Sequence, residues 1–270
     1  MHTSDRRRRL RDYLNSKECI RPASVFDAIS SRIAYSMGFE VGMLGGSVAS
    51  AVVLGAPDLT VITLTELAEQ VHRITRASDI SQVVDADHGY GNALNVMRTV
   101  NELEDAGASG LTIEDTNLPS RYGAKGKEEL ITTTEMLGKL QAAVEARRDP
   151  ETVIIARTHA INAEDLEHAV DRVAQYQDTG VDAIFLMGIK EEGQLEAVRK
   201  VTNLPFVLGS TPESLTNDML AKHGARVVLR GHGTFTDTVR TIYESLRAQA
   251  TGRTSAQGSA SEPTAEMTEV

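Results

Sequence analysis

The chain has 270 residues, of which 41% are hydrophobic, and it carries a formal net charge of -10. A chain of this length can bury a large core, either as one barrel domain or as two smaller domains. The acidic balance argues against nucleic-acid binding, which needs a basic face, and no apolar run approaches the roughly 20 residues that a membrane span requires.

The N-terminal region contains a run of four arginines, Arg6 to Arg9, and no hydrophobic stretch follows it. We therefore expect no secretory signal here, but the solvated start of a helix, with a contact between subunits as the alternative. The one cysteine, Cys19, excludes an intrachain disulfide and is expected to be a buried, inert thiol. These features predict a cytoplasmic protein.

Short runs rich in β-branched residues alternate with amphipathic stretches along most of the chain. The expected strands are residues 23–26, 41–44, 82–85, 110–113, 153–156, 183–186, 206–208 and 227–229. Between these runs, apolar residues recur every three or four positions, as at Leu67, Val71 and Ile74, which places them on one helix face. Left-handed C-caps are expected at the glycines that end several helices, Gly38, Gly107, Gly180 and Gly224.

Eight strand–helix units in about 250 residues predict a closed parallel (β/α)8 barrel, with an open doubly wound sheet as the alternative. Residues 1–249 are expected to form this single domain. Residues 250–270 are rich in Ser, Thr, Ala, Gly and Glu without periodic apolar positions, which predicts a disordered tail. In a barrel, the chemically active groups lie just after the C-terminal ends of the strands.

Acidic residues follow two neighbouring predicted strands. Asp85 and Asp87 are two positions apart at the end of one strand, and Glu114 follows the next. Because neighbouring strands lie about 4.8 Å apart, the three carboxylates can converge. They would repel one another unless a cation neutralised them, and an oxygen-only set of ligands suits Mg²⁺. Helix capping and solvation of loops is the alternative for these acids.

Groups suited to binding an anion follow two other predicted strands. Gly45, Gly46 and Ser47 can present backbone N–H groups to a carboxylate, although a tight strand-to-helix turn explains the same pattern. Arg157 closes the fifth strand, where its guanidinium can bind a carboxylate with two hydrogen bonds or form an ion pair with the acids.

A histidine follows the last predicted strand. His232 lies between two glycines, and the ordinary pKa of an imidazole suits proton transfer. His88 and His159 also lie at strand ends, so position alone does not single out His232. Asp27 and Arg32, near the first strand, are expected at the rim of the same pocket.

With these residues in place, the sequence resembles the isocitrate lyase and phosphoenolpyruvate mutase superfamily. The resemblance runs in order from about residue 23 to residue 243 and is carried by residues 24–27, 45–49, 85–91, 113–115 and 155–158. It implies an (α/β)8 barrel, commonly a homotetramer with a helix exchanged between subunits. It also implies Mg²⁺, or alternatively Mn²⁺, on Asp85, Asp87 and Glu114, and a 2-oxo acid whose carboxylate is held by Gly46, Ser47 and Arg157.

One loop helps to choose between branches of the superfamily. The carbon–carbon lyases have a Lys-Lys-Cys-Gly-His-type loop with a catalytic cysteine, whereas residues 121–126 read Arg-Tyr-Gly-Ala-Lys-Gly here. The phosphonate branch has an Asn-bearing loop that has no clear counterpart in this chain. The resemblance is closest to the oxaloacetate decarboxylase branch, through residues 46–50, 87–98 and 231–232. His159 and Arg230 depart from the usual residues of that branch.

The resemblance thus implies Mg²⁺-dependent decarboxylation of oxaloacetate to pyruvate and CO₂ through a metal-stabilised enolate. Arg157 and the Gly45–Ser47 segment would hold the C1 carboxylate, and His232 would orient the C4 carboxylate, with Asp27 as a further catalytic candidate. A thiol-independent lyase or hydrolase of a related acid (2-methylisocitrate-like, dimethylmalate-like or phosphonopyruvate) is the alternative. A barrel that binds a dicarboxylate without turnover is a second alternative.

Overall fold

The computed structural model describes residues 1–123 and 128–252, which contain eight β-strands and eleven α-helices. The strands are β1 (Ala23–Ser24), β2 (Val41–Leu44), β3 (Ser81–Asp85), β4 (Gly110–Glu114), β5 (Val153–Thr158), β6 (Ala183–Leu186), β7 (Phe206–Leu208) and β8 (Ala225–Val228). Each pairs in parallel with the next along the chain. All eight predicted strands are confirmed, with ends shifted by at most two residues.

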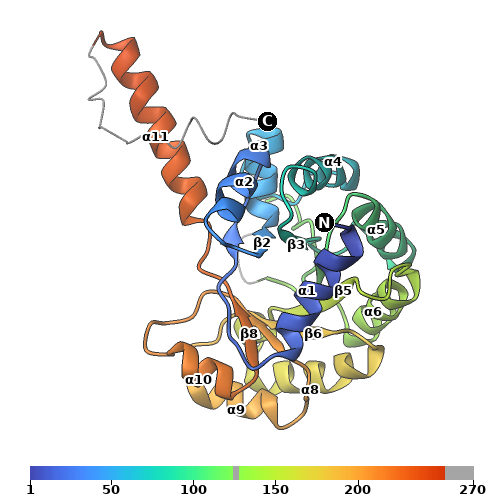
Figure 1. The fold of residues 1–270 in the computed structure, drawn as a ribbon. Coiled ribbons are helices and arrows are strands. Elements are labelled where there is room, and N and C mark those ends of the chain that lie inside the picture. The colour runs from blue at the N-terminus through green and yellow to red at the C-terminus, as the bar shows by residue number, and fades with distance from the viewer. Residues whose placement is uncertain (124–127, 253–270) are drawn as a thin grey trace.

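The sheet curls toward closure rather than lying open. Ile20, just before β1, forms a parallel bridge with Val227 in β8. Its N–H donates to the Arg226 carbonyl at 2.8 Å, and its own carbonyl accepts from the Val228 N–H at 3.0 Å. These bonds join the two edge strands, so the barrel is confirmed over the doubly wound alternative (Figure 1).

Helices surround the sheet, as Figure 1 shows. They are α1 (Thr3–Asn15), α2 (Ala28–Ser36), α3 (Gly46–Leu54), α4 (Leu64–Thr75), α5 (Ala93–Asp105), α6 (Thr133–Ala146), α7 (Ala160–Ala163), α8 (Leu166–Tyr176), α9 (Glu192–Arg199), α10 (Asn217–Lys222) and α11 (Gly233–Ala250), with the 3-10 turn η1 (Gln177–Thr179) after α8. The four glycines expected at C-caps have φ angles between 87° and 92°. The left-handed conformation predicted for them is therefore confirmed.

The apolar core has two parts, one on each side of the sheet. Outward-facing strand residues such as Val84 and Ile154 pack against the surrounding helices. Inward-facing residues such as Val83 and Phe185 fill the barrel, together with Leu10 of α1. Since α1 supplies side chains to the inner core, it closes one end of the barrel and leaves the opposite end for a site.

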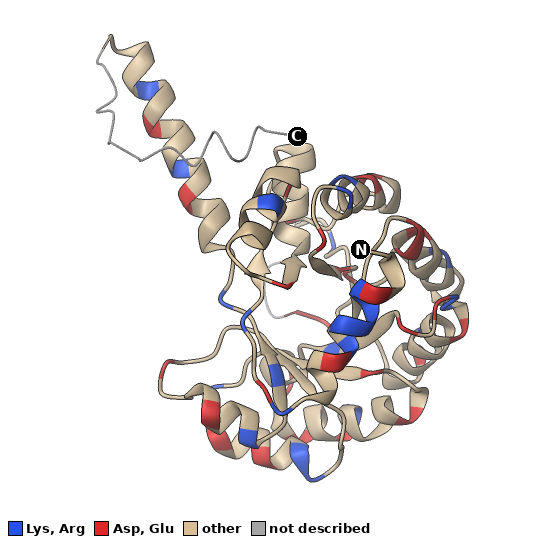
Figure 2. Ribbon diagram, in the orientation of Figure 1, with Lys and Arg blue, Asp and Glu red and all other residues tan. Residues whose placement is uncertain are grey.

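Two arginines of α1 are buried rather than solvated, which corrects the expectation from the sequence for these two, whereas Arg8 is exposed. Arg6 and Arg7 are only 7% and 6% exposed. Arg7 donates from Nε to the Ala108 carbonyl at 3.0 Å and from NH2 to the Glu104 carbonyl at 2.7 Å, and its NH1 lies 2.7 Å from Asp149 Oδ2. The basic face of α1 thus binds backbone carbonyls at the N-terminal end of the barrel (Figure 2).

The last described helix, α11, projects away from the barrel and buries none of its residues (Figure 1). No helix among the described residues is both long and apolar enough to span a membrane. The tail predicted to be disordered, residues 250–270, lies outside the described residues from residue 253 onward.

The arginine contacts of α1 generate a stability prediction. Arg7→Ala should lower the free energy of unfolding by about 2–4 kcal/mol, because it leaves two buried carbonyls and Asp149 without their donor. Arg8→Ala is the matched control: that side chain is 56% exposed, so its loss should cost no more than about 0.5 kcal/mol. Denaturant unfolding followed by circular dichroism measures both, and equal losses would contradict the proposed role of Arg7.

Candidate active site

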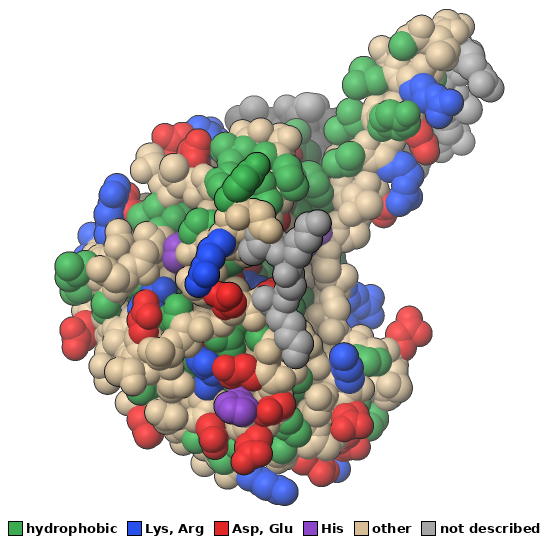
Figure 3. Space-filling view, turned by 180° about the vertical axis from the view of Figure 1, so that it is seen from behind, with side chains coloured by type: hydrophobic (Ala, Val, Ile, Leu, Met, Phe, Trp, Pro, Cys, Tyr) green, Lys and Arg blue, Asp and Glu red, His purple; other side chains and the backbone are tan. Residues whose placement is uncertain are grey.

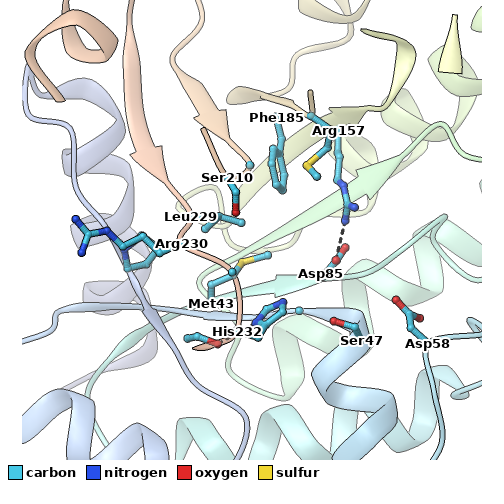
Figure 4. Close-up of a pocket in the computed structure, with 16 residues that line it drawn as sticks. Met43, Ser47, Asp58, Asp85, Arg157, Phe185, Ser210, Leu229, Arg230 and His232 are labelled. Carbon is cyan, nitrogen blue, oxygen red and sulfur yellow. Dashed lines mark hydrogen bonds and ion pairs between the residues drawn. The ribbon is translucent and has the colours of Figure 1, made fainter. Parts of the chain in front are cut away.

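A cavity of about 180 Å³ lies at the C-terminal ends of the strands, opposite α1. Its polar lining includes Ser24, Ser47, Asp58, Asp85, Arg157, Ser210, Arg230 and His232. Its apolar lining includes Pro22, Met43, Phe185, Met187 and Leu229. The cavity therefore joins a charged region to an apolar one, and Figure 4 shows how these side chains face each other.

Asp85, the last residue of β3, is held in place by four donors. Oδ1 accepts from the Thr112 hydroxyl at 3.0 Å and from the Asp87 N–H at 3.3 Å. Oδ2 accepts from Arg157 at 2.7 Å and from the Gly46 N–H at 3.4 Å. Burial alone would raise the pKa of Asp85, but the charge and hydrogen bond of Arg157 outweigh it, so the pKa lies below its ordinary value. Asp85 is thus an ionised, oriented carboxylate.

Arg157, near the end of β5, lies between two of the predicted acids. Its NH1 is 2.7 Å from Asp85 Oδ2, and its Nε is 3.0 Å from Glu114 Oε2. The strand register places Glu114 directly opposite Arg157, which explains why these two side chains meet. The guanidinium also lies 5.2 Å from the centre of the Phe185 ring. The ion pair that the sequence left as an alternative is therefore present (Figure 4).

The other two predicted metal ligands accept fewer hydrogen bonds than Asp85. Glu114 is 4% exposed, and its Oε2 has no well-directed hydrogen-bond donor. Asp87 is 6% exposed, and among the described residues no donor binds its carboxylate. Burial raises the pKa of Asp87 well above its ordinary value, and the charges of Asp85 and Glu114 raise it further. Both carboxylates need positive charge beyond that of Arg157.

The backbone around Asp87 lets the turn at the start of α3 approach its carboxylate closely. A Cβ at Gly46 would lie 2.5 Å from Asp87 Oδ1, so only glycine fits against this carboxylate. Asp87 itself has a φ of 47°, a left-handed conformation that is strained for a residue with a side chain. Three buried carboxylates facing one guanidinium, with oxygen ligands only, fit a hard divalent cation such as Mg²⁺.

A second group of possible metal ligands lies outside the barrel. Ligand atoms of Glu192 and Glu196 on α9 and of His223 at the end of α10 lie within 4.8 Å of one another. Glu192 is already paired with His223 at 2.7 Å and with Lys222 at 3.6 Å. These contacts balance its charge, so the outer group has less need of a cation than the barrel acids have.

The glycine-rich turn after β2 begins a helix. Gly45 is the N-cap of α3, so the first N–H groups of that helix, with Ser47, are placed at the cavity. Helix N-termini attract anions because these N–H groups have no partner within the helix. The sequence left open whether residues 45–47 form a strand-to-helix turn or an anion site. One and the same segment can serve as both.

His232 reaches the same cavity from the loop after β8. Its Nδ1 lies 2.9 Å from the Ser24 hydroxyl. A Cβ at Gly45 would lie 2.6 Å from the imidazole, so glycine at that position lets the ring approach. Burial lowers the pKa of His232, which favours the neutral ring. Arg230, in contrast, is exposed at the rim and points away from the cavity in Figure 4.

The structure does not bring Asp27 together with the other candidates. Its carboxylate accepts the Ser30 N–H at 2.7 Å in a capping box at the start of α2, and it does not line the cavity. Arg32 does not line it either. A catalytic role for Asp27 stays a prediction for which the cavity gives no geometry.

Sequence reasoning missed one acid of the cavity, Asp58, and gave no role to a second acid, Asp115. Asp58 lines the cavity from the loop between α3 and α4, and burial and the charge of Asp85 raise its pKa. It follows no strand, so the strand-end rule could not find it. Asp115 is completely buried behind Glu114, where it accepts hydrogen bonds from Thr158 at 2.7 Å and Tyr176 at 2.9 Å. Its place directly after Glu114 was the available signal.

Comparison with known proteins supports this description. Residues 10–250 match the family model described as phosphoenolpyruvate phosphomutase. A protein from Rhodopseudomonas palustris named oxaloacetate decarboxylase is 54% identical over 245 residues, covering 90% of this chain and 85% of the relative.

Two solved structures share the fold. The structure of 2,3-dimethylmalate lyase, described as a member of the PEP mutase/isocitrate lyase superfamily, matches with a TM-score of 0.84 at 26% identity. Phosphonopyruvate hydrolase, in a complex with oxalate and Mg²⁺, matches with a TM-score of 0.83 at 26% identity. Each comparison covers 99% of this chain and 93% of the other.

Proposed function

The chain belongs to the phosphoenolpyruvate mutase/isocitrate lyase superfamily, and from this premise we propose that it catalyses the Mg²⁺-dependent decarboxylation of oxaloacetate to pyruvate and CO₂. The relative named oxaloacetate decarboxylase, at 54% identity over most of both chains, supports this activity. The structural observation that carries the proposal is one cavity with a buried acid–arginine cluster at one side and an apolar wall at the other.

The acids would bind the metal that contacts the 2-oxo group, and the arginine would bind the neighbouring carboxylate. Asp85, Asp87 and Glu114 would hold the metal, with Mn²⁺ as an alternative to Mg²⁺. When bound, the cation supplies Lewis-acid stabilisation of negative charge on the C2 oxygen of the substrate. The related hydrolase with oxalate and Mg²⁺ supports this pairing of a hard cation with a small dicarboxylate.

The chain's own groups would fix the C1 carboxylate. Arg157 lines the cavity with a guanidinium that has five N–H donors, so it can contact a substrate carboxylate while it stays paired with Asp85. The N–H groups of Gly46 and Ser47, at the start of α3, would bind the same carboxylate. Holding C1 at two places converts a flexible diacid into one reactive geometry.

The apolar wall would favour loss of the C4 carboxylate. In the reaction the C3–C4 bond breaks, its electron pair moves toward C2 and its oxygen, CO₂ leaves, and C3 takes up one proton from water or a nearby acid. Met43, Phe185, Met187 and Leu229 solvate a carboxylate poorly and neutral CO₂ well, which favours this step. A neutral His232 would orient the C4 carboxylate without the positive charge that would stabilise it.

The absence of a thiol at the site separates this activity from that of a thiol-dependent lyase. The one cysteine of the sequence, Cys19, precedes β1 and packs against the core, and it is not among the residues that line the cavity. A thiol that protonates a leaving carbanion is therefore not supplied by this chain's cavity.

The metal role and the substrate can be tested together. Wild-type protein with Mg²⁺ should form pyruvate and CO₂ from oxaloacetate faster than the metal alone, and EDTA should stop it. Asp85→Ala should lower this rate by at least about 100-fold, since metal stabilisation is worth several kcal/mol. Asp105→Ala, which removes a carboxylate that is 69% exposed, should keep the wild-type rate.

The alternatives make different products in the same assay. Release of glyoxylate, acetate with oxalate, or phosphate from a panel of 2-oxo and 2-hydroxy acids would assign the protein to another branch. Binding of oxaloacetate without any product would leave a dicarboxylate-binding barrel. An Asp85→Ala protein that releases CO₂ at the wild-type rate in EDTA would refute the metal role.

We further propose a cytoplasmic homotetramer in which α11 packs on a second copy of the chain. Val239, Ile242, Tyr243 and Leu246 form an exposed apolar face on this helix. Exposed apolar residues of α2, α3 and the segments that follow them form a second group, Ile29, Met37, Phe39, Val52 and Leu54. Figure 3 shows apolar side chains along the helix and on the body beside it. Such patches commonly mark protein interfaces.

The assembly is tested by placing charges on α11. The Ile242→Asp/Leu246→Asp double variant should shift the protein to a smaller species in sedimentation or light-scattering experiments, because the apolar face could no longer be buried. Thr241→Asp, on the opposite face of the helix, should keep the wild-type mass. A double variant that stays at the wild-type mass would contradict the packing of α11 on a second copy.

A further inference from the structure

His159 stands at the end of β5, next to the proposed site, and its backbone is firmly held. The His159 N–H donates to Asp115 Oδ1 at 3.2 Å. Asp115 is completely buried, and its other oxygen accepts from the Thr158 and Tyr176 hydroxyls. This carboxylate therefore binds two successive residues, and it holds the backbone that carries the His159 ring.

Both nitrogens of the His159 ring contact charged side chains. Nδ1 lies 2.7 Å from Glu128 Oε2, and Nε2 lies 2.8 Å from Arg157 NH2. A guanidinium can only donate, so a hydrogen bond between Arg157 and His159 is accepted by the ring, whereas a hydrogen bond to a carboxylate is donated by it. The two nitrogens thus link Glu128 on the Nδ1 side of the ring to Arg157 on the Nε2 side.

The contact between Arg157 and His159 completes the support of the guanidinium. NH1 is held by Asp85, Nε lies beside Glu114, and NH2 is held by His159. The imidazole also stands 3.1 Å from Glu114 Oε2, the buried oxygen without a well-directed donor. His159 and Arg157 therefore both contact the same oxygen of Glu114.

We propose that His159 is a positioning residue, which holds the Arg157 guanidinium and the Glu114 carboxylate in the arrangement that binds cation and substrate. Glu128 holds the Nδ1 side of the ring, and Asp115 fixes its backbone. This inference rests on the proposed function for the roles of Arg157 and Glu114. It assigns a purpose to a histidine that the sequence placed at a strand end without a role and that does not line the cavity.

Two substitutions of His159 distinguish the contributions of the two ring nitrogens. The amide of His159→Gln reaches the place of Nε2, so it can still accept from Arg157. The amide of His159→Asn reaches only the place of Nδ1, so it keeps the Glu128 side and loses the Arg157 side. Glu128→Ala removes the partner of Nδ1 and leaves the imidazole in place.

The first readout is the binding of Mn²⁺ alone, measured by electron paramagnetic resonance without oxaloacetate. Partners of metal ligands typically change metal affinity by 10- to 100-fold. His159→Asn should raise the Mn²⁺ dissociation constant by about tenfold, and Glu128→Ala should raise it by less. His159→Gln should stay within about threefold of wild type.

The second readout is steady-state turnover of oxaloacetate. If Arg157 binds the C1 carboxylate equally in the ground and transition states, its misplacement raises KM more than it lowers kcat. His159→Asn should therefore raise KM by about tenfold with kcat changed by less than about threefold, and His159→Gln should restore KM. Thermal unfolding of each variant separates these effects from loss of the fold.

The proposal is overturned if the Asn and Gln variants have equal Mn²⁺ affinity and equal KM. It is also overturned if His159→Asn only lowers the unfolding temperature, which would give the ring a merely structural role. The Mn²⁺ comparison does not depend on the identity of the substrate. Failure of the wild-type protein to decarboxylate oxaloacetate would thus count against the proposed function alone, while the Asn–Gln difference decides the role of His159.

Discussion

The site depends on the concentration of negative charge at the ends of two adjacent parallel strands, β3 and β4. Asp85, Asp87 and Glu114 are each less than 10% exposed, and the guanidinium of Arg157, from the next strand, pairs with two of them. Carboxylates removed from water are stable only when their charge is compensated, and one arginine cannot compensate three of them. The charge and hydrogen bond of Arg157 lower the pKa of Asp85. Burial and the charges of Asp85 and Glu114 raise the pKa of Asp87, to which no described donor is bound. A cation is the simplest completion of this arrangement.

The rest of the barrel makes such a costly arrangement stable. At one end, the arginines of α1 bind backbone carbonyls and α1 adds Leu10 to the inner core, so this end is closed and well satisfied. At the other end, the register that pairs Glu114 with Arg157 brings opposite charges together without any need for loop rearrangement. Behind them, the buried Asp115 ties the end of β4 to β5. Stability and chemistry are thus separated to opposite ends of one sheet, as is usual for this fold.

The sequence predicted the barrel well because its signals are local. β-branched runs locate the strands to within two residues, and glycine positions such as Gly107 and Gly180 report left-handed C-caps. The rule that active groups follow the strands located Asp85 and Arg157, because their positions also depend on local sequence. The sequence did not predict the burial of Arg7, because the residues that bury it are about 100 or more positions away. It did not predict Asp58 either, because this residue reaches the cavity from a loop. Asp27 has the local pattern of a site residue, but the same pattern also describes the helix cap that it forms.

The central claim is that the barrel acids, rather than the outer group on α9 and α10, hold the divalent cation. Crystals of the protein grown with Mn²⁺ and oxalate, measured for anomalous scattering, test it directly. The account predicts an anomalous peak among Asp85, Asp87 and Glu114, with oxalate between the cation and Arg157. A peak found only at Glu192, Glu196 and His223 would contradict it.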